Sequence, residues 1–323
     1  MPGGNPPVLV VTRLDDITAD TVICELNRRK VPVVRLDPGN FPDTVTVTSA
    51  FDSCGPSGML RTATRAMDVG DVRSVYWRRP NPYAAPEGIA GQDARWCAEE
   101  ARYGLGGLLG ALPGAHYVNH PWRNRDAEYK PAQLATAARC GLTIPPTVIT
   151  NEPDEARRFA DEYEPVIYKP LRETNYLDDH GRALTVWIDD VRADQLGDGT
   201  AHTAHLFQQR VNKIADIRMT VVGDRPFPVR IDGSPGVDWR RHYESLTYTL
   251  LDAPPDVAEG VRAYLDAFGL TFGAFDFGLD IDGRWWFYEC NPNGQWAWFP
   301  EPITRQITAA IADQLHNPPG AAA

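Results

Sequence analysis

The strongest constraint on the fold is a β-hairpin signal near the C-terminal end of the sequence. The dipeptide Asp282-Gly283 separates two stretches that are rich in aromatic residues. An Asp-Gly pair between two strand-like segments is typical of a two-residue hairpin turn. Such a turn pairs Ile281 with Arg284, and the same count along both strands places Asp276 directly opposite Glu289.

This register predicts a metal site. Opposed side chains in an antiparallel pair have Cβ atoms roughly 5 Å apart, and two carboxylates at that separation repel each other unless a cation lies between them. Asn291 lies two residues beyond Glu289 and faces the same side. Two carboxylates and an amide oxygen suit Mg²⁺ bound to nucleotide phosphates. The count also places Asp280 on this face, opposite Trp285. The alternative is a solvated polar face, which the surrounding aromatic residues disfavour.

The composition excludes several other classes of protein. The 323 residues are 43% hydrophobic, which fits an ordinary globular enzyme of two or three structural units. A formal charge of −11 disfavours a nucleic-acid enzyme, because such proteins carry a basic face. We find no signal peptide, no stretch of the ~18 apolar residues that span a membrane, and no metal or disulfide pattern among five cysteines. We therefore expect a cytoplasmic protein without nucleic-acid or membrane partners.

Strand-like and helix-like segments alternate along the chain, which predicts an α/β protein. The first 36 residues follow a strand-helix-strand pattern that favours a parallel sheet. We divide the chain into an N-terminal domain at 1–120, a central lobe at 121–205 and a C-terminal lobe at 206–323. The central lobe should begin with one helix over 126–140.

The common phosphate-binding loops are missing from the sequence. No G-x-G-x-x-G follows the first strand, and the sequence has no Gly-Lys dipeptide, so neither a dinucleotide fingerprint nor a Walker loop is present. Lysine is rare, with only four residues, so its positions are informative. Lys169 ends an apolar strand, where a semi-buried ammonium group needs an anionic partner. Lys130 alone is typical of a helix surface.

Two further segments combine charged and apolar side chains. After an extended linker that begins at His205, a strand would bring Asp216 and Arg218 to one face. The alternative is an ordinary surface ion pair with a cross-strand neighbour, which contributes little when exposed. The run Asp238–Arg241 places two guanidinium groups beside a tryptophan, which suits bidentate binding of phosphate or carboxylate.

The order and spacing of these motifs resemble the ATP-grasp superfamily and, from Val75 onward, the ATP-grasp ribosomal peptide maturases, the microviridin-type graspetide synthetases. The resemblance covers most of the chain. It implies an ATP-grasp fold with α+β lobes, preceded by a pre-ATP-grasp domain with a parallel sheet. The stretches that carry it are Val75–Pro80, Lys130–Leu134, Gly141–Pro145, Thr150-Asn151, Tyr168-Lys169, Asp216–Arg218, Val237–Arg240 and Glu289–Pro292.

The resemblance also implies roles for individual residues. Lys130 and Lys169 would hold the α- and β-phosphates of ATP, and Asp216 would hold its ribose. Arg218 and Arg240 would steady the transferred phosphoryl group. The remaining implied ligands are the adenine-binding stretch of Gln208, Gln209, Arg210 and Val211, with Arg241 in the nucleotide site, and the metal ligands Asp276, Glu289 and Asn291. Two Mg²⁺ ions are expected, with Mn²⁺ as a substitute.

The implied activity is that of an ATP-dependent ligase. Asp or Glu side chains of a ribosomal precursor peptide would be activated as acyl phosphates and joined within the same peptide, as esters to Thr or Ser or as amides to Lys. One alternative is a ligase that adds free amino acids to a peptide or protein terminus, and another is a non-catalytic nucleotide-binding regulator.

The expected partner is a precursor peptide with a leader and a core. We expect the enzyme, as a homodimer, to recognise this peptide through the polar stretch 178–203. This stretch is too long for a plain connection, which predicts a hairpin or a docking element.

Overall fold

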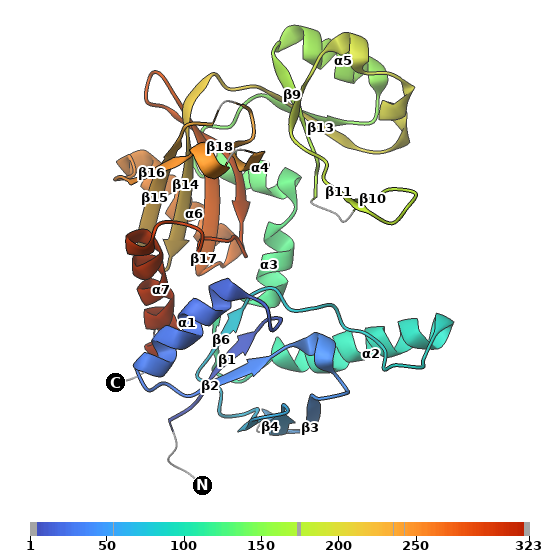
Figure 1. Ribbon diagram of the computed structural model, residues 1–323, viewed down its shortest axis with the longest axis vertical. Helices are drawn as coiled ribbons and strands as arrows, with labels where there is room; N and C mark the ends of the chain where they lie inside the picture. Colours follow the sequence, from blue (N-terminus) through green and yellow to red (C-terminus); the bar gives the residue numbers. More distant parts are fainter. Residues whose placement is uncertain (1–4, 54, 173–175, 235, 242, 320–323) are drawn as a thin grey trace.

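The computed structural model describes residues 5–53, 55–172, 176–234, 236–241 and 243–319, arranged in three parts (Figure 1). The N-terminal part contains the predicted parallel sheet, and its strand order is β2-β1-β6-β7. Its elements are β1 (Val8–Val11), α1 (Ile17–Arg28), β2 (Val33–Leu36), β6 (Ser74–Trp77), α2 (Gly91–Leu109) and β7 (His116–Val118).

A second, antiparallel sheet lies within the N-terminal part and was not anticipated. It consists of β3 (Thr46–Asp52), β4 (Gly55–Arg61) and β5 (Ala66–Asp68). Leu60 and Met67 of this sheet are buried in the same core as Leu9 and Val34 of the parallel sheet. The small sheet thus extends the hydrophobic core of the N-terminal part.

The single helix expected over 126–140 is wrong. Two helices occupy this region, α3 (Pro121–Ala127) and α4 (Lys130–Arg139). Pro131 lies in the first turn of α4. A proline inside a helix lacks the N–H for the helical hydrogen bond and clashes with the preceding turn, so α3 ends before Pro131. In the first turn of α4 that N–H would have no helical partner, so the proline is tolerated there.

The central lobe is built on an antiparallel sheet of order β12-β9-β13-β8. The expected extended linker at His205 is wrong, because β13 pairs with both β8 and β9. Its Leu206 and Phe207 are buried, which explains why this segment forms an interior strand. The elements of the lobe are β8 (Thr147–Thr150), α5 (Pro153–Glu162), β9 (Val166–Lys169), β10 (Tyr176–Leu177), β11 (Ala183–Leu184), β12 (Asp189–Val191) and β13 (His205–Gln209).

The C-terminal part is a five-stranded antiparallel sheet of order β16-β15-β14-β17-β18. Its elements are β14 (Lys213–Val222), β15 (Arg225–Asp232), β16 (Thr247–Leu250), α6 (Pro255–Phe268), β17 (Phe272–Asp280), β18 (Trp285–Asn291) and α7 (Glu301–His316). Short 3-10 turns lie at 38–40, 193–195, 198–202, 239–241 and 243–245. None of the helices in the described ranges combines the length and apolarity that a bilayer crossing requires.

The predicted hairpin exists, but its turn differs from the prediction. Asp280 N–H donates to the carbonyl of Arg284, so three residues form the loop and the predicted Ile281–Arg284 pair is wrong. Trp285 pairs with Leu279 and not with Asp280. An extra residue in β18, Tyr288, then restores the expected count. Asp276 therefore lies opposite Glu289, as predicted, because the two departures cancel.

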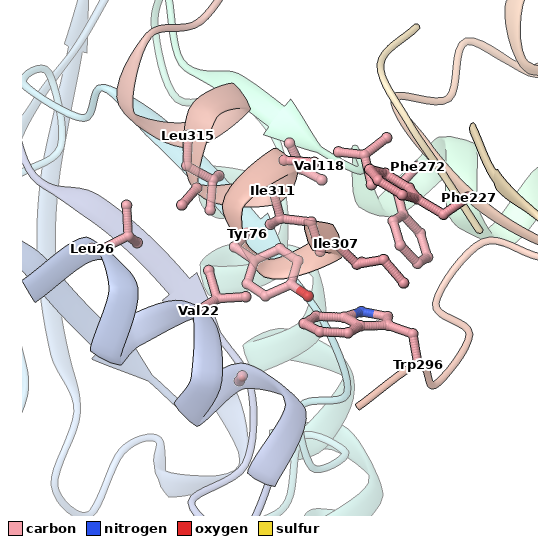
Figure 2. Close-up of a cluster of buried hydrophobic side chains, with 14 of the residues drawn as sticks. Val22, Leu26, Tyr76, Val118, Phe227, Phe272, Trp296, Ile307, Ile311 and Leu315 are labelled. Atoms are coloured by element: carbon pink, nitrogen blue, oxygen red, sulfur yellow. The ribbon is translucent and has the colours of Figure 1, made fainter. Parts of the chain in front are cut away.

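The N-terminal part and the C-terminal part share one hydrophobic core. Figure 2 shows Val22 and Leu26 of α1 and Tyr76 of β6 beside Ile307 and Ile311 of α7. The helix α7 packs against α1, β6 and β7 on one side and against β14 and β15 on the other. The central lobe has a separate small core of Ala156, Phe159, Val166 and Phe207.

Candidate active site

A cavity of about 540 Å³ lies at the junction of the three parts and contains most of the predicted site residues. Its wall includes Ile167 of the central lobe and Arg79 of the N-terminal part. Nine predicted site residues line it, namely Lys169, Arg210, Val211, Asp216, Arg218, Arg240, Asp276, Glu289 and Asn291. Lys130, Gln208, Gln209 and Arg241 are not among its lining residues.

The predicted metal ligands share one face of the β17–β18 pair. Asp276 and Glu289 are directly paired, and Asn291 is paired with Ala274. The Asn291 amide nitrogen lies 3.3 Å from an oxygen of each carboxylate and donates to both. A rotation of this amide would present its oxygen to a cation between the carboxylates.

Each carboxylate has its own cationic partner. Arg218 Nη1 lies 2.7 Å from Asp276 Oδ2, and Lys130 Nζ forms an ion pair with Glu289 Oε2. Burial raises the pKa of Asp276 above its usual range, and Arg218 opposes this shift. Burial acts in the same direction on Glu289, but the nearby Lys130 and Lys169 hold the pKa of Glu289 well below its usual range.

Lys130 reaches Glu289 because α4 is docked on the edge of β18. Gln133, one turn along α4, donates from Nε2 to the Cys290 carbonyl at 2.9 Å and accepts from the Cys290 N–H at 3.0 Å. This amide occupies both hydrogen-bonding groups of one strand residue, so it fixes the helix against the strand. Lys130, a surface residue by sequence pattern alone, is thereby brought to the carboxylates.

Lys169, the last residue of β9 in the central lobe, is a buried cation that lines the cavity. Its side chain is 5% exposed, its Nζ lies 3.3 Å from Gln208 Oε1 and 4.9 Å from the centre of the Tyr288 ring. Burial lowers the pKa of Lys169 to about 8, although the Glu289 carboxylate opposes this change. An anionic ligand beside this ammonium group would compensate its loss of hydration.

Asp216 is paired with Lys213, whose Nζ lies 2.7 Å and 2.8 Å from its two carboxylate oxygens. Lys213 Nζ also donates to the Val237 carbonyl at 2.7 Å. Burial raises the pKa of Asp216 to about 6 despite this partner. At neutral pH the Asp216 carboxylate is therefore ionised and available to accept hydrogen bonds from hydroxyl groups.

The predicted adenine-binding stretch is partly engaged within the protein. The N–H groups of Gln209 and Arg210 donate to the carbonyls of Pro146 and Pro165 at 2.9 Å and 2.8 Å. A base bound here would use other backbone groups of the stretch. The Val211 side chain and Ile167 supply apolar surface to the cavity.

The two neighbouring arginines have different surroundings. Arg240 lines the cavity and forms two hydrogen bonds of 2.9 Å with Asp238. Arg241 contacts the central lobe, where it donates to the Ile188 carbonyl at 3.2 Å and lies 5.0 Å from the Trp187 ring centre. This geometry favours Arg240 over Arg241 as a ligand for anions in the cavity.

The side chains on this face of the β17–β18 pair are suited to binding a divalent cation. Asp276 Oδ1 is buried and has no hydrogen-bond partner within the described part of the chain. A buried carboxylate oxygen without a partner is unfavourable unless a ligand satisfies it. With Glu289 and Asn291 alongside, the three side chains offer the oxygen ligands that Mg²⁺ prefers. These residues would hold the ion.

Sequence reasoning missed several residues of the cavity. Tyr288 is the extra residue of the bulge, which turns it toward the cavity beside Glu289. Arg79 lines the cavity from the segment after β6, Gln295 lines it from the loop after β18, and Trp298, also in the lining, packs on Trp239 at 5.0 Å between ring centres. A strict alternation of strand residues hides Tyr288, whereas Arg79 lies within the noted stretch Val75–Pro80.

Comparisons with known proteins find relatives of the same fold. Residues 7–125 match the family described as the MvdD pre-ATP grasp domain. No curated protein matches the chain. Among solved structures, a RiPP-associated ATP-grasp ligase of Chryseobacterium gregarium, in complex with ADP and a leader and core peptide, is 24% identical with a TM-score of 0.86 over 96% of both chains.

Two macrocyclases of Microcystis aeruginosa MRC are also similar to this chain. MdnC, bound with the precursor peptide MdnA, is 27% identical with a TM-score of 0.83, and MdnB is 26% identical with a TM-score of 0.79. In both cases the match covers 96% of this chain and 99% of the other. Along almost its whole length the chain is thus similar to ATP-grasp ligases associated with ribosomally synthesised and post-translationally modified peptides (RiPPs), and it shares their fold.

Proposed function

We propose that the protein is an ATP-dependent ligase that forms ester or amide cross-links within a ribosomal precursor peptide. The observation that carries the proposal is the cavity, in which two opposed carboxylates and an amide lie with Lys169, Arg218 and Arg240, while Lys130 pairs with Glu289. Two of the similar solved structures are described as macrocyclases, one of them with its precursor peptide bound.

The residues divide into groups with separate tasks. Lys130 and Lys169 neutralise nucleotide phosphates, Asp216 accepts hydrogen bonds from the ribose, and Arg218 and Arg240 face the transferred phosphoryl group. Asp276, Glu289 and Asn291 would hold Mg²⁺, which neutralises phosphate charge when it is bound. The solved structures include complexes with ADP and with Mg and ADP, which supports both cofactors. We propose two ions, with Mn²⁺ as a substitute.

The reaction needs no nucleophile from the protein. Transfer of the γ-phosphoryl group to an Asp or Glu side chain of the peptide yields ADP and an acyl phosphate. A Thr or Ser hydroxyl, or a Lys amine, then attacks the acyl carbon, and phosphate leaves. Positioning and charge neutralisation account for catalysis of this kind.

The polar stretch 178–203 supplies the proposed contact with the leader. It includes β11, the second strand of the β10–β11 hairpin, and the side chains of Leu184 in this strand and of Val186 and Trp187 beyond it are exposed. Exposed apolar side chains on a short hairpin are suited to binding a peptide segment. The homodimer, the cytoplasmic location and the lack of nucleic-acid partners remain predictions.

Mass spectrometry tests the proposal. Incubation with a precursor peptide, ATP and Mg²⁺ should yield a product that has lost one water for each bond formed. A product heavier by an added amino acid would support the alternative ligase that extends a terminus. Absence of ATP turnover with every candidate peptide would support the nucleotide-binding regulator.

A further inference from the structure

Arg78 is a buried arginine that connects the N-terminal part to the loop after β18. It follows β6, is 2% exposed, and directs its guanidinium out of its own domain. Nη1 donates to the carbonyls of Asn293 and Gly294 at 3.2 Å each, and Nη2 donates to Gln295 Oε1 at 2.9 Å. All three acceptors lie within four residues of the proposed metal ligand Asn291.

The other groups around Arg78 hold it in this orientation. Arg78 Nε lies 3.6 Å from Asp16 Oδ2, and Asp16 in turn accepts a hydrogen bond of 2.7 Å from Thr12. From α1, Thr18 Oγ1 donates to the same Gln295 oxygen at 2.5 Å. The N-terminal part therefore binds the loop through a charged group with fixed geometry and a second, neutral donor.

The same loop is bound on its other side by a residue of the active site. Arg218, which pairs with Asp276, also donates from Nη2 to the Gln295 carbonyl at 3.2 Å. A Cβ at Gly294 would overlap Ala274 and the Arg218 guanidinium, so the loop lies as close to β14 and β17 as its backbone permits. The position of the loop thus determines where Arg218 and Asn291 can lie.

We propose that Arg78 is a positioning residue for the metal site, so that the N-terminal part completes the Mg²⁺-binding geometry of the C-terminal lobe. Arg78 acts through the carbonyls of Asn293 and Gly294 and the side chain of Gln295, and would touch neither nucleotide nor metal. Groups that orient metal ligands indirectly typically change metal affinity about 10- to 100-fold when they are replaced. The proposal rests on the proposed function, since it assumes that Asp276, Glu289 and Asn291 hold Mg²⁺.

The experiment measures metal binding and not turnover. Thermal unfolding of the full chain is followed at a fixed, saturating ADP concentration while Mg²⁺ is increased, and ADP binding is measured separately in EDTA. Arg78→Lys keeps a positive charge beside Asp16 but loses the forked contacts. It should require about tenfold more Mg²⁺ to reach half of the Mg²⁺-dependent shift in unfolding temperature. Binding of ADP in EDTA should change less than twofold, whereas a general loss of structure would weaken both.

A second variant covers the case in which Arg78→Lys fails to fold. Gln295→Met removes the side-chain acceptor and leaves the Arg78–Asp16 pair intact, and it should raise the Mg²⁺ requirement in the same direction. The control is Arg73→Met. Arg73 also crosses between the parts, donating to the His316 carbonyl at 2.7 Å, but this contact is remote from the metal face. Arg73→Met should lower stability without changing the Mg²⁺ requirement.

The outcomes separate the inference from the function beneath it. If the wild-type protein shows no Mg²⁺-dependent shift with ADP, the proposed function fails. If the wild-type protein responds and both Arg78→Lys and Gln295→Met respond at its Mg²⁺ concentration, only the positioning role is overturned. An equal rise in the Mg²⁺ requirement of Arg73→Met would also overturn it. The effect would then follow from any weakened contact between the N-terminal and C-terminal parts.

Discussion

Asp276 and Glu289 face each other across β17 and β18, but their cationic partners come from opposite sides: Arg218 from β14 and Lys130 from α4. The pair is therefore electrostatically asymmetric. The fold disfavours the ionised form of Asp276 through burial and favours that of Glu289 through two lysines.

This asymmetry predicts different effects of two amide substitutions on the metal-free enzyme. Asp276→Asn removes a carboxylate whose folded-state pKa is raised, so it should increase the free energy of unfolding at pH 7 by about 1 kcal/mol. Glu289→Gln removes a carboxylate whose folded-state pKa is depressed and leaves buried lysines uncompensated, so it should lower that free energy by about 2 kcal/mol. Denaturant unfolding in EDTA measures both, and both variants should lose ligation.

The control for these substitutions is Asp280→Asn. The Asp280 carboxylate accepts hydrogen bonds from the Trp286 indole and from the N–H groups of Asp282 and Arg284 in the hairpin loop. It lies outside the cavity lining, so the variant should keep substantial activity. Loss of activity equal to that of Asp276→Asn would show that the metal assignment is mistaken.

Lys169 predicts the pH dependence of nucleotide binding. Burial lowers its pKa to about 8, so the charge that we propose binds phosphate is lost from the free enzyme above that pH. The dissociation constant for ADP in EDTA should rise about tenfold between pH 7 and pH 9. Lys169→Arg should bind with little pH dependence over this range, since a guanidinium stays protonated. Equal slopes for the two proteins, measured by calorimetry, would contradict the phosphate-binding role.

The same shift has a consequence for stability. The folded-state pKa of Lys169 is depressed, so the unfolded chain binds this proton more tightly between pH 8 and its ordinary value of 10.5. The Lys169 contribution to the free energy of unfolding therefore rises with pH across that window. Lys169→Met should increase the stability of the nucleotide-free protein at pH 7 by about 1–3 kcal/mol while removing nucleotide binding.

The β10–β11 hairpin and the residues that follow it are the proposed leader contact, so substitutions there should change the kinetics only for substrates that carry the leader. Leu184 and Val186 lie two residues apart and are both 46% exposed. Replacing both by Glu should raise KM for the full precursor about tenfold, equivalent to 1.4 kcal/mol of binding. The rate with a leaderless core peptide should not change. The control is Ile281→Glu, at an exposed aliphatic side chain in the β17–β18 loop. Equal losses on both substrates would place the contact with the core instead.

A substitution at Gly294 should reduce activity for steric reasons alone. A methyl group at Gly294 would overlap Ala274 and Arg218, so Gly294→Ala should displace the Arg218 guanidinium and reduce kcat at least about tenfold. Gly107→Ala, in the helix α2 with no atom near the added methyl, is the control. It should preserve activity and stabilise the helix by about 1 kcal/mol. Normal kcat for Gly294→Ala would show that the loop can move without consequence.

The parts of the structure that the sequence predicted are those specified by local pattern. The parallel strands of the N-terminal part follow from continuous apolar runs, and the Asp276–Glu289 pair follows from an Asp-Gly turn. The bulge at Tyr288 has no such signal. The Tyr288 ring fills the space beside Gly278, where a Cβ would overlap the Tyr288 hydroxyl. This fit depends on residues of two different strands.

Contacts between distant segments account for the other differences. The strand β13 was interpreted as a linker because its central position depends on pairing with β8 and β9, which no local pattern reveals. Lys130 looked like a surface residue because its partner Glu289 is 159 residues away. The role of Arg78 likewise depends on a loop more than 200 residues further along the chain.

The core shared through α7 affects the order in which the chain can fold during synthesis. Val8, Val10 and Val118 of the first sheet lie in the core that α7, near the end of the chain, helps to form. Domains usually fold as they emerge from the ribosome, the N-terminal one first. Here the first domain keeps an uncovered apolar face until almost the whole chain has been made. A protein expressed without residues 301–316 should therefore aggregate.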